Sequence, residues 1–231
     1  DSILNQTEQN IEIIISDNFS DDGTSEYLKK ISQNDNRMTY FLQNPTLTAF
    51  DNFMFVLSKA KGEHFLWAAH DDTRSKDYIK KLSHCLDKNP GTILAFPDVY
   101  KITPYDNIGT KINFKFDTTG LSNLKKANLI SQLQCFNFYG VWRTAELKKI
   151  KKFYCTWWAD LPILIAASSL GDFSYVKGPR FNYFEVIKTN IERVKYQDSS
   201  QNFNLIKSVL ELIIITFKTC FKTSGLFFAV Y

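Results

Sequence analysis

Carboxylates gather at two points in the first third of this sequence, each directly after a short apolar run. Asp17 follows a β-branched run at 11–16. Asp71 and Asp72 follow a second apolar run at 63–69. Such runs are typical of buried parallel strands, and ligands bind beyond the carboxyl ends of parallel strands in open α/β sheets. We therefore expect these acids to lie together at one edge of a sheet.

Carboxylates that lie together repel one another unless a cation or a hydrogen-bonding ligand compensates their charge. A divalent metal bridging a diphosphate is an economical compensator, since Mg²⁺ or Mn²⁺ takes one or two carboxylates and fills its other positions with phosphate oxygens and water. The competing interpretation is that the acids serve only as helix caps and turn residues. That interpretation suits Asp21 and Asp22. It suits Asp71 and Asp72 less well, because Ser75 is available to cap the next helix.

The elements around these acids predict an α/β fold with a mostly parallel sheet and flanking helices, because short apolar runs alternate with helical patterns. The predicted strands are 11–16, 38–42, 63–69 and 92–96, and the predicted helices begin at Thr24 or Ser25, at Ala49 and at Ser75 and run to about 31, 60 and 87. Beyond residue 100 the pattern predicts a hairpin at 101–116, a helix at 122–133, an extended segment at 136–143, a helix at 160–170 and short strands near 173–176 and 179–185.

Composition limits the classes of protein that remain. The 231 residues are 44% hydrophobic and 23% charged, so the chain can fill a core. A net charge of +4 is too mild for a dedicated nucleic-acid binder, and we expect no nucleic-acid partner. The four cysteines are far apart and form no C-x-x-C pair, which argues against a zinc knuckle and a disulfide-dense secreted framework. A cytoplasmic protein is the expectation.

Several segments resemble the family 2 glycosyltransferases of GT-A (Rossmann-like) fold, which work with inversion. The segments that carry the resemblance are 5–12 (NQTEQNIE), 13–24 (IIISDNFSDDGT), 62–72 (GEHFLWAAHDD), 139–143 (YGVWR) and 159–161 (ADL). They follow one another in the family's order over roughly residues 3–185. The resemblance implies transfer of a sugar from a nucleotide-sugar donor to an acceptor hydroxyl.

The resemblance also implies roles for five residues. Asp17, with Asn18 beside it in the donor-binding loop, matches the acid that hydrogen-bonds the nucleotide base. Asp71 matches a position near the ribose or diphosphate, and Asp72 matches the ligand of a divalent cation, Mn²⁺ or Mg²⁺. Asp160 matches the general base of inverting members.

These implied roles agree with elementary chemistry. A base must take the proton of the acceptor hydroxyl, and a metal neutralises the charge that develops on the departing diphosphate. Asp160 follows Trp157 and Trp158, and aromatic surroundings raise the pKa of a carboxylate toward useful basicity. Asp160 is equally suited to cap the following helix, a role it can fill at the same time. His70 and Ala159 depart from the family pattern, since both stand where acids are usual.

The chain is predicted to divide into three parts. Residues 1–100 form the nucleotide-sugar-binding half of the GT-A domain, residues 101–187 the acceptor-binding half, and residues 188–231 a helical tail. From 101 to 152 there are ten Lys or Arg against three acids, which suits an anionic partner such as a phosphate-bearing acceptor or a lipid surface. A solvated surface is the competing interpretation of these lysines.

The apolar segment 205–231 is interrupted by charged residues before it reaches the ~18 apolar residues that a spanning helix needs. It suits a helix lying on a membrane surface, or an ordinary terminal helix packed on the core. The expected acceptor is a cell-surface polysaccharide or a lipid-linked glycan, at the inner face of the cell membrane.

Two alternatives to a transferase remain. One is a degenerate, non-catalytic GT-A module that binds a nucleotide or a partner, because the family's first strand and its loop would have to precede Asp1. The other is a nucleotidyltransferase, which would need a Gly-rich, basic phosphate loop near the start, and no such loop is visible in the sequence.

Overall fold

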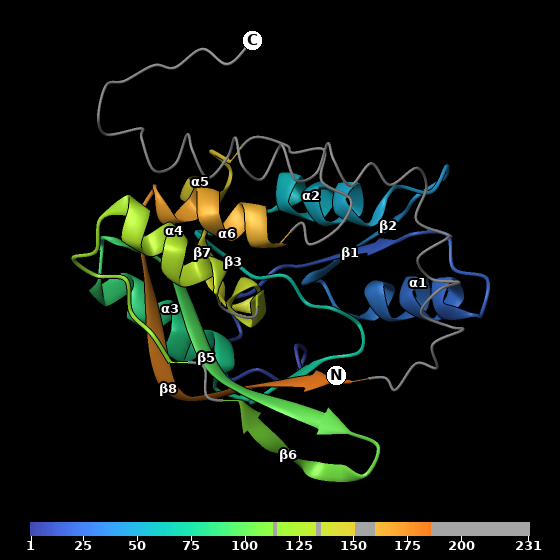
Figure 1. Cartoon of the computed structure of the whole chain (residues 1–231). Coiled ribbons are helices and arrows are strands. Elements are labelled where there is room, and N and C mark those ends of the chain that lie inside the picture. The colour runs from blue at the N-terminus through green and yellow to red at the C-terminus, as the bar shows by residue number, and fades with distance from the viewer. Residues whose placement is uncertain (113–114, 133–134, 151–159, 186–231) are drawn as a thin grey trace, which may run out of the picture.

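Two groups of strands carry the fold, a parallel pair near the N-terminus and a larger mixed sheet (Figure 1). The computed structural model describes residues 1–112, 115–132, 135–150 and 160–185. The strands are β1 (Ile13–Asp17), β2 (Met38–Leu42), β3 (His64–Phe65), β4 (Thr73–Arg74), β5 (Thr92–Thr103), β6 (Asp106–Ile112), β7 (Val141–Arg143) and β8 (Asp172–Phe184). The helices are α1 (Thr24–Asn34), α2 (Ala49–Lys59), α3 (Tyr78–Lys88), α4 (Asn123–Ser131), the 3₁₀ helix η1 (Cys135–Tyr139), α5 (Thr144–Leu147) and α6 (Asp160–Ser168).

The N-terminal pair follows the predicted pattern. β1 and β2 pair in parallel, with Ile13 opposite Met38 and Asp17 opposite Leu42. α1 makes the crossover between them, and Figure 1 shows α1 and α2 on opposite sides of the pair. The strand predicted at 38–42 is confirmed, and Asp17 is the last residue of β1, where the chain turns into a polar loop.

The larger sheet has the order β3-β7-β5-β8-β4, and β6 pairs with β5 as the predicted hairpin. β5 and β8 run parallel, whereas the other pairings in this sheet are antiparallel. The α/β class is confirmed, and the sheet is mixed. Apart from the β5–β6 hairpin, the antiparallel pairings were not predicted, because the alternation of strands and helices indicates a mostly parallel sheet.

The apolar run at 63–69 supplies much less strand than expected. Only His64 and Phe65 pair, in antiparallel fashion with β7. The reason is Trp67, which is 3% exposed and donates its indole N–H to the carbonyl of Phe53 at 3.0 Å. Trp67 also stacks on Phe138 with ring centroids 4.3 Å apart. Beyond Phe65 the run is therefore a loop that contributes Trp67 to the core.

The last strand is continuous where two short strands were predicted. β8 runs from Asp172 to Phe184, and its register against β5 shifts between Phe96 and Asp98. Gly178 lies at this irregularity with a φ of 115°, a conformation that glycine adopts readily. The sequence pattern is interrupted at Gly178 and Pro179, but the strand resumes beyond them.

One of two predicted helix starts is wrong. α1 begins at Thr24, as predicted, after Gly23, which has a φ of 87°. α3 begins at Tyr78, later than predicted from Ser75, whose hydroxyl donates to Asp77 at 2.7 Å. The predicted spans of both helices are otherwise close to those observed.

The core lies on both faces of β5 and β8. Figure 1 shows α4, α5 and α6 on one side of these strands and α3 on the other. The fully buried side chains are mostly aromatic or aliphatic: Trp142, Tyr78, Phe96, Phe173, Phe181, Leu82, Leu86, Leu94, Ile130, Leu147, Leu164 and Ile165. Aromatic stacking of Trp67 on Phe138 fixes η1 against the sheet, and η1 in turn presents Tyr139 and Cys135.

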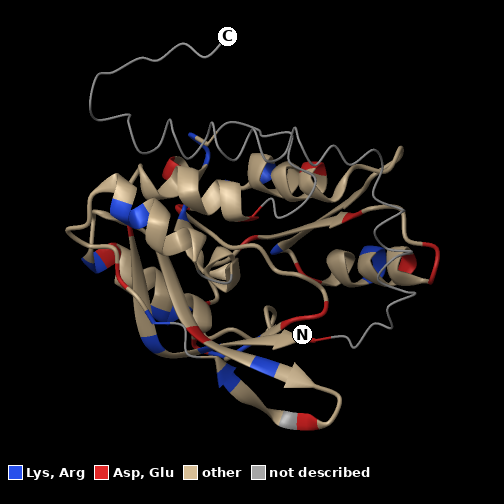
Figure 2. Ribbon diagram, in the orientation of Figure 1, with Lys and Arg blue, Asp and Glu red and all other residues tan. Residues whose placement is uncertain are grey.

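Charged side chains are spread unevenly over the surface. Figure 2 shows Lys and Arg on α4 and along the β5–β6 hairpin, within the segment 101–152 that the sequence singles out. Across the described ranges, no helix is long and apolar enough to cross a membrane. The predicted tail at 188–231 lies outside the described residues.

Candidate active site

Asp17 is held at the end of β1 by the loop that follows it. Its carboxylate accepts hydrogen bonds from the amide and hydroxyl of Ser20 at 3.1 and 2.7 Å, from the hydroxyl of Ser25, and from Tyr40 at 2.8 Å. Burial alone would raise the pKa of Asp17, but these hydrogen bonds outweigh it and lower the pKa below its usual value of 3.8. Asp17 is therefore an ionised anchor of its loop.

Asn18 joins that loop to the segment before α2. Its side-chain amide donates to the carbonyl of Leu47 at 2.9 Å, and its side-chain oxygen accepts from the amide of Leu47 at 2.7 Å. This two-point contact fixes the two loops that border the end of β1. Asp17 and Asn18 thus shape one wall of the candidate site.

Asp71 and Asp72 lie in the loop that enters β4. Asp71 is exposed, whereas Asp72 is 7% exposed and accepts a hydrogen bond from the amide of Phe184 at 3.2 Å. Burial is the main reason that the pKa of Asp72 is raised to about 6, and the neighbouring Asp71 raises it further. A buried carboxylate with one neutral donor is a group that a cation would stabilise.

Asp160 is the first residue of α6. Its carboxylate accepts from the amide of Leu161 at 3.0 Å and from the thiol of Cys135 in η1. Burial raises the pKa of Asp160, and the bonds from Leu161 and Cys135 oppose that increase. The predicted neighbours Trp157 and Trp158 lie outside the described residues.

Tyr139 connects these acids. Burial raises the pKa of its phenol, and the carboxylates of Asp160, Asp72 and Asp71 raise it further, in that order. The ring stacks on Phe181 of β8 with centroids 5.3 Å apart. Asp71, Asp72 and Asp160, here called the acid cluster, therefore all act electrostatically on one phenol although they come from two distant parts of the chain.

The structure does not join all the predicted residues. Among the described residues, no hydrogen bond or ion pair links Asp17 or Asn18 to the acid cluster. Asp17 ends a strand of the separate β1–β2 pair, whereas the loop of Asp72 leads into the larger sheet. Asp17, expected to lie with Asp71 and Asp72 at one sheet edge, thus belongs to a different sheet from the one that the loop of Asp72 enters.

Residues other than the predicted acids also build the site. Tyr139 lies within a recognised segment, but nothing in its spacing marks its ring as the meeting point of the acids. Cys135 had no sequence signal at all, because its partner Asp160 is far along the chain. Arg74 follows Asp72 closely in sequence, and its position on β4 beside the cluster is a product of the fold.

Another group of side chains is arranged to hold a cation. Ligand atoms of Glu63, His64 and Asp87 lie within 4.8 Å of one another. This group and Asp72 lie near opposite ends of β5. The group is near Arg143, which donates to the carbonyl of Thr92 at the start of β5. Asp72 accepts from the amide of Phe184, which lies opposite the end of β5. Arg143 also approaches Glu63 at 4.0 Å and opposes a cation there.

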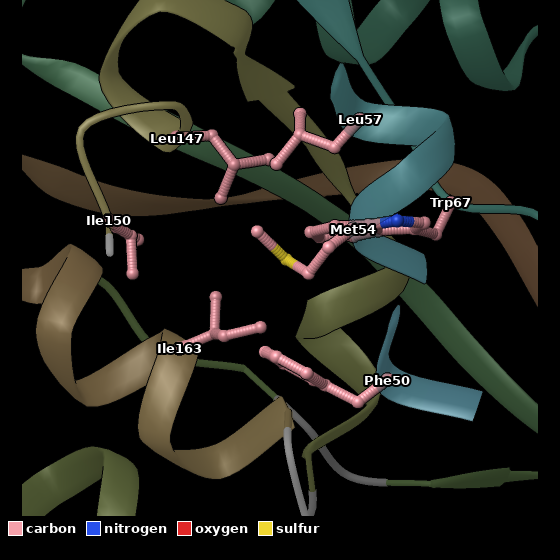
Figure 3. Close-up of a pocket in the computed structure, with 7 residues that line it drawn as sticks. All are labelled: Phe50, Met54, Leu57, Trp67, Leu147, Ile150 and Ile163. Atoms are coloured by element: carbon pink, nitrogen blue, oxygen red, sulfur yellow. The ribbon is translucent and has the colours of Figure 1, made fainter. Parts of the chain in front are cut away.

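An apolar pocket lies apart from the acids (Figure 3). It is lined by side chains from α2, α6 and the segments between, namely Phe50, Met54, Leu57, Trp67, Leu147, Ile150 and Ile163. None of these side chains carries a carboxylate, so the pocket belongs to the packing of α2 against α6.

Comparison with known sequences identifies the family. The model of the family described as Glycosyl transferase family 2 matches residues 1–142, more than half of the chain. An uncharacterised glycosyltransferase of Haemophilus influenzae is 32% identical over 88 residues, which are 38% of this chain and 27% of that protein. The glycosyltransferase GlyA of Streptococcus pneumoniae is 35% identical over 83 residues, 36% of this chain and 12% of GlyA. The matched segments thus span under a third of either relative.

Comparison with solved structures identifies the fold. TarS 1–349 of S. aureus, solved in complex with UDP-GlcNAc, superposes with a TM-score of 0.70 and 16% identity, covering 93% of this chain and 59% of that one. GalNAc-T7, solved with UDP, GalNAc and Mn²⁺, gives a TM-score of 0.58 and 14% identity over 81% of this chain and 40% of that one. With the family match and the acid cluster in place, the chain belongs to glycosyltransferase family 2 and has the GT-A fold.

Proposed function

We propose that this chain transfers a sugar, with inversion, from a nucleoside diphosphate donor to an acceptor hydroxyl. The observation that carries the proposal is that Asp160, Asp72 and Asp71 all act electrostatically on the phenol of Tyr139, with Asp72 buried. Carboxylates on one side suit a metal and a diphosphate, and a separate buried carboxylate suits a base. The two solved neighbours bound UDP-GlcNAc or UDP with Mn²⁺, which supports the same chemistry here.

The acids fit a divalent cation. Asp72 offers a buried carboxylate that accepts one described hydrogen bond, from the amide of Phe184, and Asp71 is exposed beside it. Oxygen ligands of this kind suit Mg²⁺ and Mn²⁺. When bound, such an ion would neutralise the negative charge that develops on the departing diphosphate. Asp72 would hold it, and Asp71 would lie near the diphosphate.

Asp160 would take the proton of the acceptor hydroxyl. Its raised pKa makes it a stronger base than an exposed aspartate, and its place in the first turn of α6 favours the ionised form. The thiol of Cys135 directs one bond to the carboxylate and so orients it. The phenol of Tyr139 is subject to the charges of both Asp160 and Asp72. It would face the sugar while the sugar is transferred.

Asp17 and Asn18 would serve the nucleotide end of the donor. Asp17 is already bonded to Ser20, Ser25 and Tyr40, so its main contribution would be to hold the loop in shape beside the base. The clamp between Asn18 and Leu47 would fix the opposite rim. The base then lies away from the acid cluster, as the length of a nucleotide sugar requires.

The proposed acceptor is a cell-surface polysaccharide or a lipid-linked glycan, reached at the inner face of the cell membrane. Support comes from the basic segment 101–152, which Figure 2 shows on α4 and the β5–β6 hairpin. The hairpin also presents Tyr105 and Ile108, which are 89% and 80% exposed. Exposed apolar side chains beside lysines suit an anionic, partly apolar surface.

A thermal-shift panel tests the proposal directly. The chain is heated with UDP-, GDP-, CDP- and ADP-linked sugars, with Mn²⁺ and with EDTA, because a ligand of the folded state raises Tm in proportion to the logarithm of its concentration. We expect one nucleotide class to raise Tm only with Mn²⁺. Absence of a shift with every donor would refute the proposal. Binding without transfer of the sugar to any acceptor or to water, measured as release of the nucleoside diphosphate, would favour the non-catalytic module.

A further inference from the structure

Arg74 is a buried cation next to the acid cluster. The residue is 5% exposed, and its guanidinium carbon lies 5.6 Å from the ring centre of Tyr78 and 5.2 Å from that of Phe181. Its Nη2 donates to the carbonyl of Trp67 at 2.8 Å. Within the described ranges, Nε and Nη1 are buried and have no hydrogen-bond partner. A guanidinium in this state is costly unless negative charge lies nearby.

Negative charge lies next to Arg74 along the chain. Asp72 directly precedes β4, Arg74 is the second residue of that strand, and the charge of Arg74 opposes the rise in the pKa of Asp72. Pairing with β8 holds both, since Asp72 accepts from the amide of Phe184 and Arg74 lies opposite Phe181. Tyr139 stacks on Phe181, and the charge of Arg74 lowers the pKa of its phenol while the acids raise it.

Arg74 forms no closed ion pair with these acids. Among the described residues, the salt bridges made by arginine join Arg37 to Asp35 and Arg143 to Glu63, and none includes Arg74. Its charge therefore acts on the whole site through the buried medium, where such interactions are screened less than at the surface. Three carboxylates and one guanidinium carry a net charge of −2, which one divalent cation neutralises.

We propose that Arg74 is a resident cation of the donor site, a positioning residue that weakens binding of a free divalent cation and strengthens binding of a diphosphate. The metal and the diphosphate are then favoured as a pair over either one alone. This inference rests on the proposed function, since it takes Asp72 to face both groups. The competing explanation is that Arg74 only packs between Tyr78 and Phe181.

Three variants separate charge from packing. Arg74→Gln removes the charge and keeps an amide that can donate to the carbonyl of Trp67. Arg74→Met removes the charge and keeps the apolar stem between the two rings. Arg74→Lys retains the charge in a different shape. Two neutral variants are used so that the test still stands if one of them fails to fold.

Calorimetric titration of the 231-residue chain gives two readouts of opposite sign. MnCl₂ is titrated alone, and UDP is titrated in EDTA. The neutral variants should bind Mn²⁺ about tenfold more tightly, because they lack the repulsion between the guanidinium and the divalent ion. This size follows from Coulomb's law for charges several ångströms apart in a medium of dielectric constant between those of protein and water. The same variants should bind metal-free UDP about tenfold more weakly by the same reasoning. Arg74→Lys should stay near the unaltered chain in both.

The outcomes distinguish the inference from the function beneath it. If the neutral variants weaken both ligands, or change neither, Arg74 is a packing residue and the inference is wrong. If the unaltered chain shows no Mn²⁺-dependent binding of UDP or of any nucleotide sugar, the proposed function is wrong and the inference falls with it. Opposite shifts for Mn²⁺ and UDP, restored by Arg74→Lys, would establish the resident cation.

Discussion

Three aspartates of the candidate site have protonation behaviour set by their immediate surroundings. Hydrogen bonds lower the pKa of Asp17 despite its burial. Burial raises the pKa of Asp72 to about 6 and also raises that of Asp160. Aspartate thus has different properties at the three positions. Surrounded by hydrogen-bond donors, as at Asp17, it stays ionised and anchors a loop, whereas burial at Asp72 and Asp160 favours binding of a cation or a proton.

Asp17→Asn should destabilise the fold by about 1–2 kcal/mol at neutral pH, because hydrogen bonds to a charged carboxylate are lost. The lowered pKa of Asp17 means that its stabilisation is complete above the unfolded value of 3.8 and disappears as pH falls through the folded value. Urea unfolding at pH 7 and near pH 3 measures this difference. Asp21→Asn, at an exposed position of the same loop, is the control, and equal losses in both variants would contradict the anchor role.

Cys135→Ala should move the acidic limb of the kcat/KM profile to higher pH. The thiol of Cys135 bonds the ionised form of Asp160 and lowers its pKa, so removal of the thiol raises that pKa. Cys135→Ser keeps a donor and should stay near the unaltered profile. Cys85→Ala, at a cysteine of α3 away from Asp160, is the control. An unmoved limb in Cys135→Ala would remove Asp160 from the role of base.

At the scale of elements, η1 and β7 position the chemistry. The turn between them is at Gly140, where a Cβ would lie 2.4 Å from the carbonyl of Ala95 and 3.0 Å from that of Asn137. Close approach of η1 to β5 therefore requires glycine here. Tyr139, the preceding residue, owes its place beside the acids to this contact.

Gly140→Ala should cost about 1–3 kcal/mol, the range for overpacking, and should also reduce donor binding by displacing Tyr139. Gly91→Ala is the matched control, since a Cβ there meets its nearest atom at 4.0 Å, on Asp172. Thermal unfolding and Mn²⁺-dependent nucleotide binding are measured on both. Equal stability of the two variants would show that the turn at Gly140 can relax.

Local patterns predicted the elements far better than their pairing. Strand and helix spans around β1, β2, α2 and α3 follow from apolar periodicity, and the motif order placed Asp17, Asp72 and Asp160. The antiparallel partners of β3 and β7 depend on contacts between distant segments, which periodicity does not encode. For the same reason Cys135 and Arg74 were missed, because each acts through a residue that only the fold brings near.

At the scale of the whole molecule, charge is distributed to separate two kinds of binding. The acid cluster lies by Tyr139, whereas Lys and Arg of 101–152 lie on α4 and the β5–β6 hairpin (Figure 2). In the proposed function, a metal and a donor would meet the acids, and an anionic surface would meet the lysines. The predicted domain boundaries at 100 and 187 remain predictions on this view.

The membrane-surface proposal predicts binding to vesicles that contain phosphatidylglycerol, and loss of that binding at high salt. Lys125→Glu, on α4, should weaken co-sedimentation, whereas Lys80→Glu, on α3 at the other side of the sheet, should leave it unchanged. Both lysines are exposed. Equal binding to neutral and anionic vesicles would overturn the proposal.

The most direct test of the account compares Asp72→Asn with Asp160→Asn. Calorimetry measures Mn²⁺-dependent binding of UDP, or of the nucleotide selected by the donor panel, and a coupled assay measures its release from the sugar. Asp72→Asn should weaken metal-dependent binding about tenfold or more, since even partners of metal ligands have effects of that size. Asp160→Asn should keep that binding and lose about 10²–10⁴-fold in transfer. Unchanged metal-dependent binding in Asp72→Asn, or lost binding in Asp160→Asn, would contradict the assignment of a metal ligand and a base to these two aspartates.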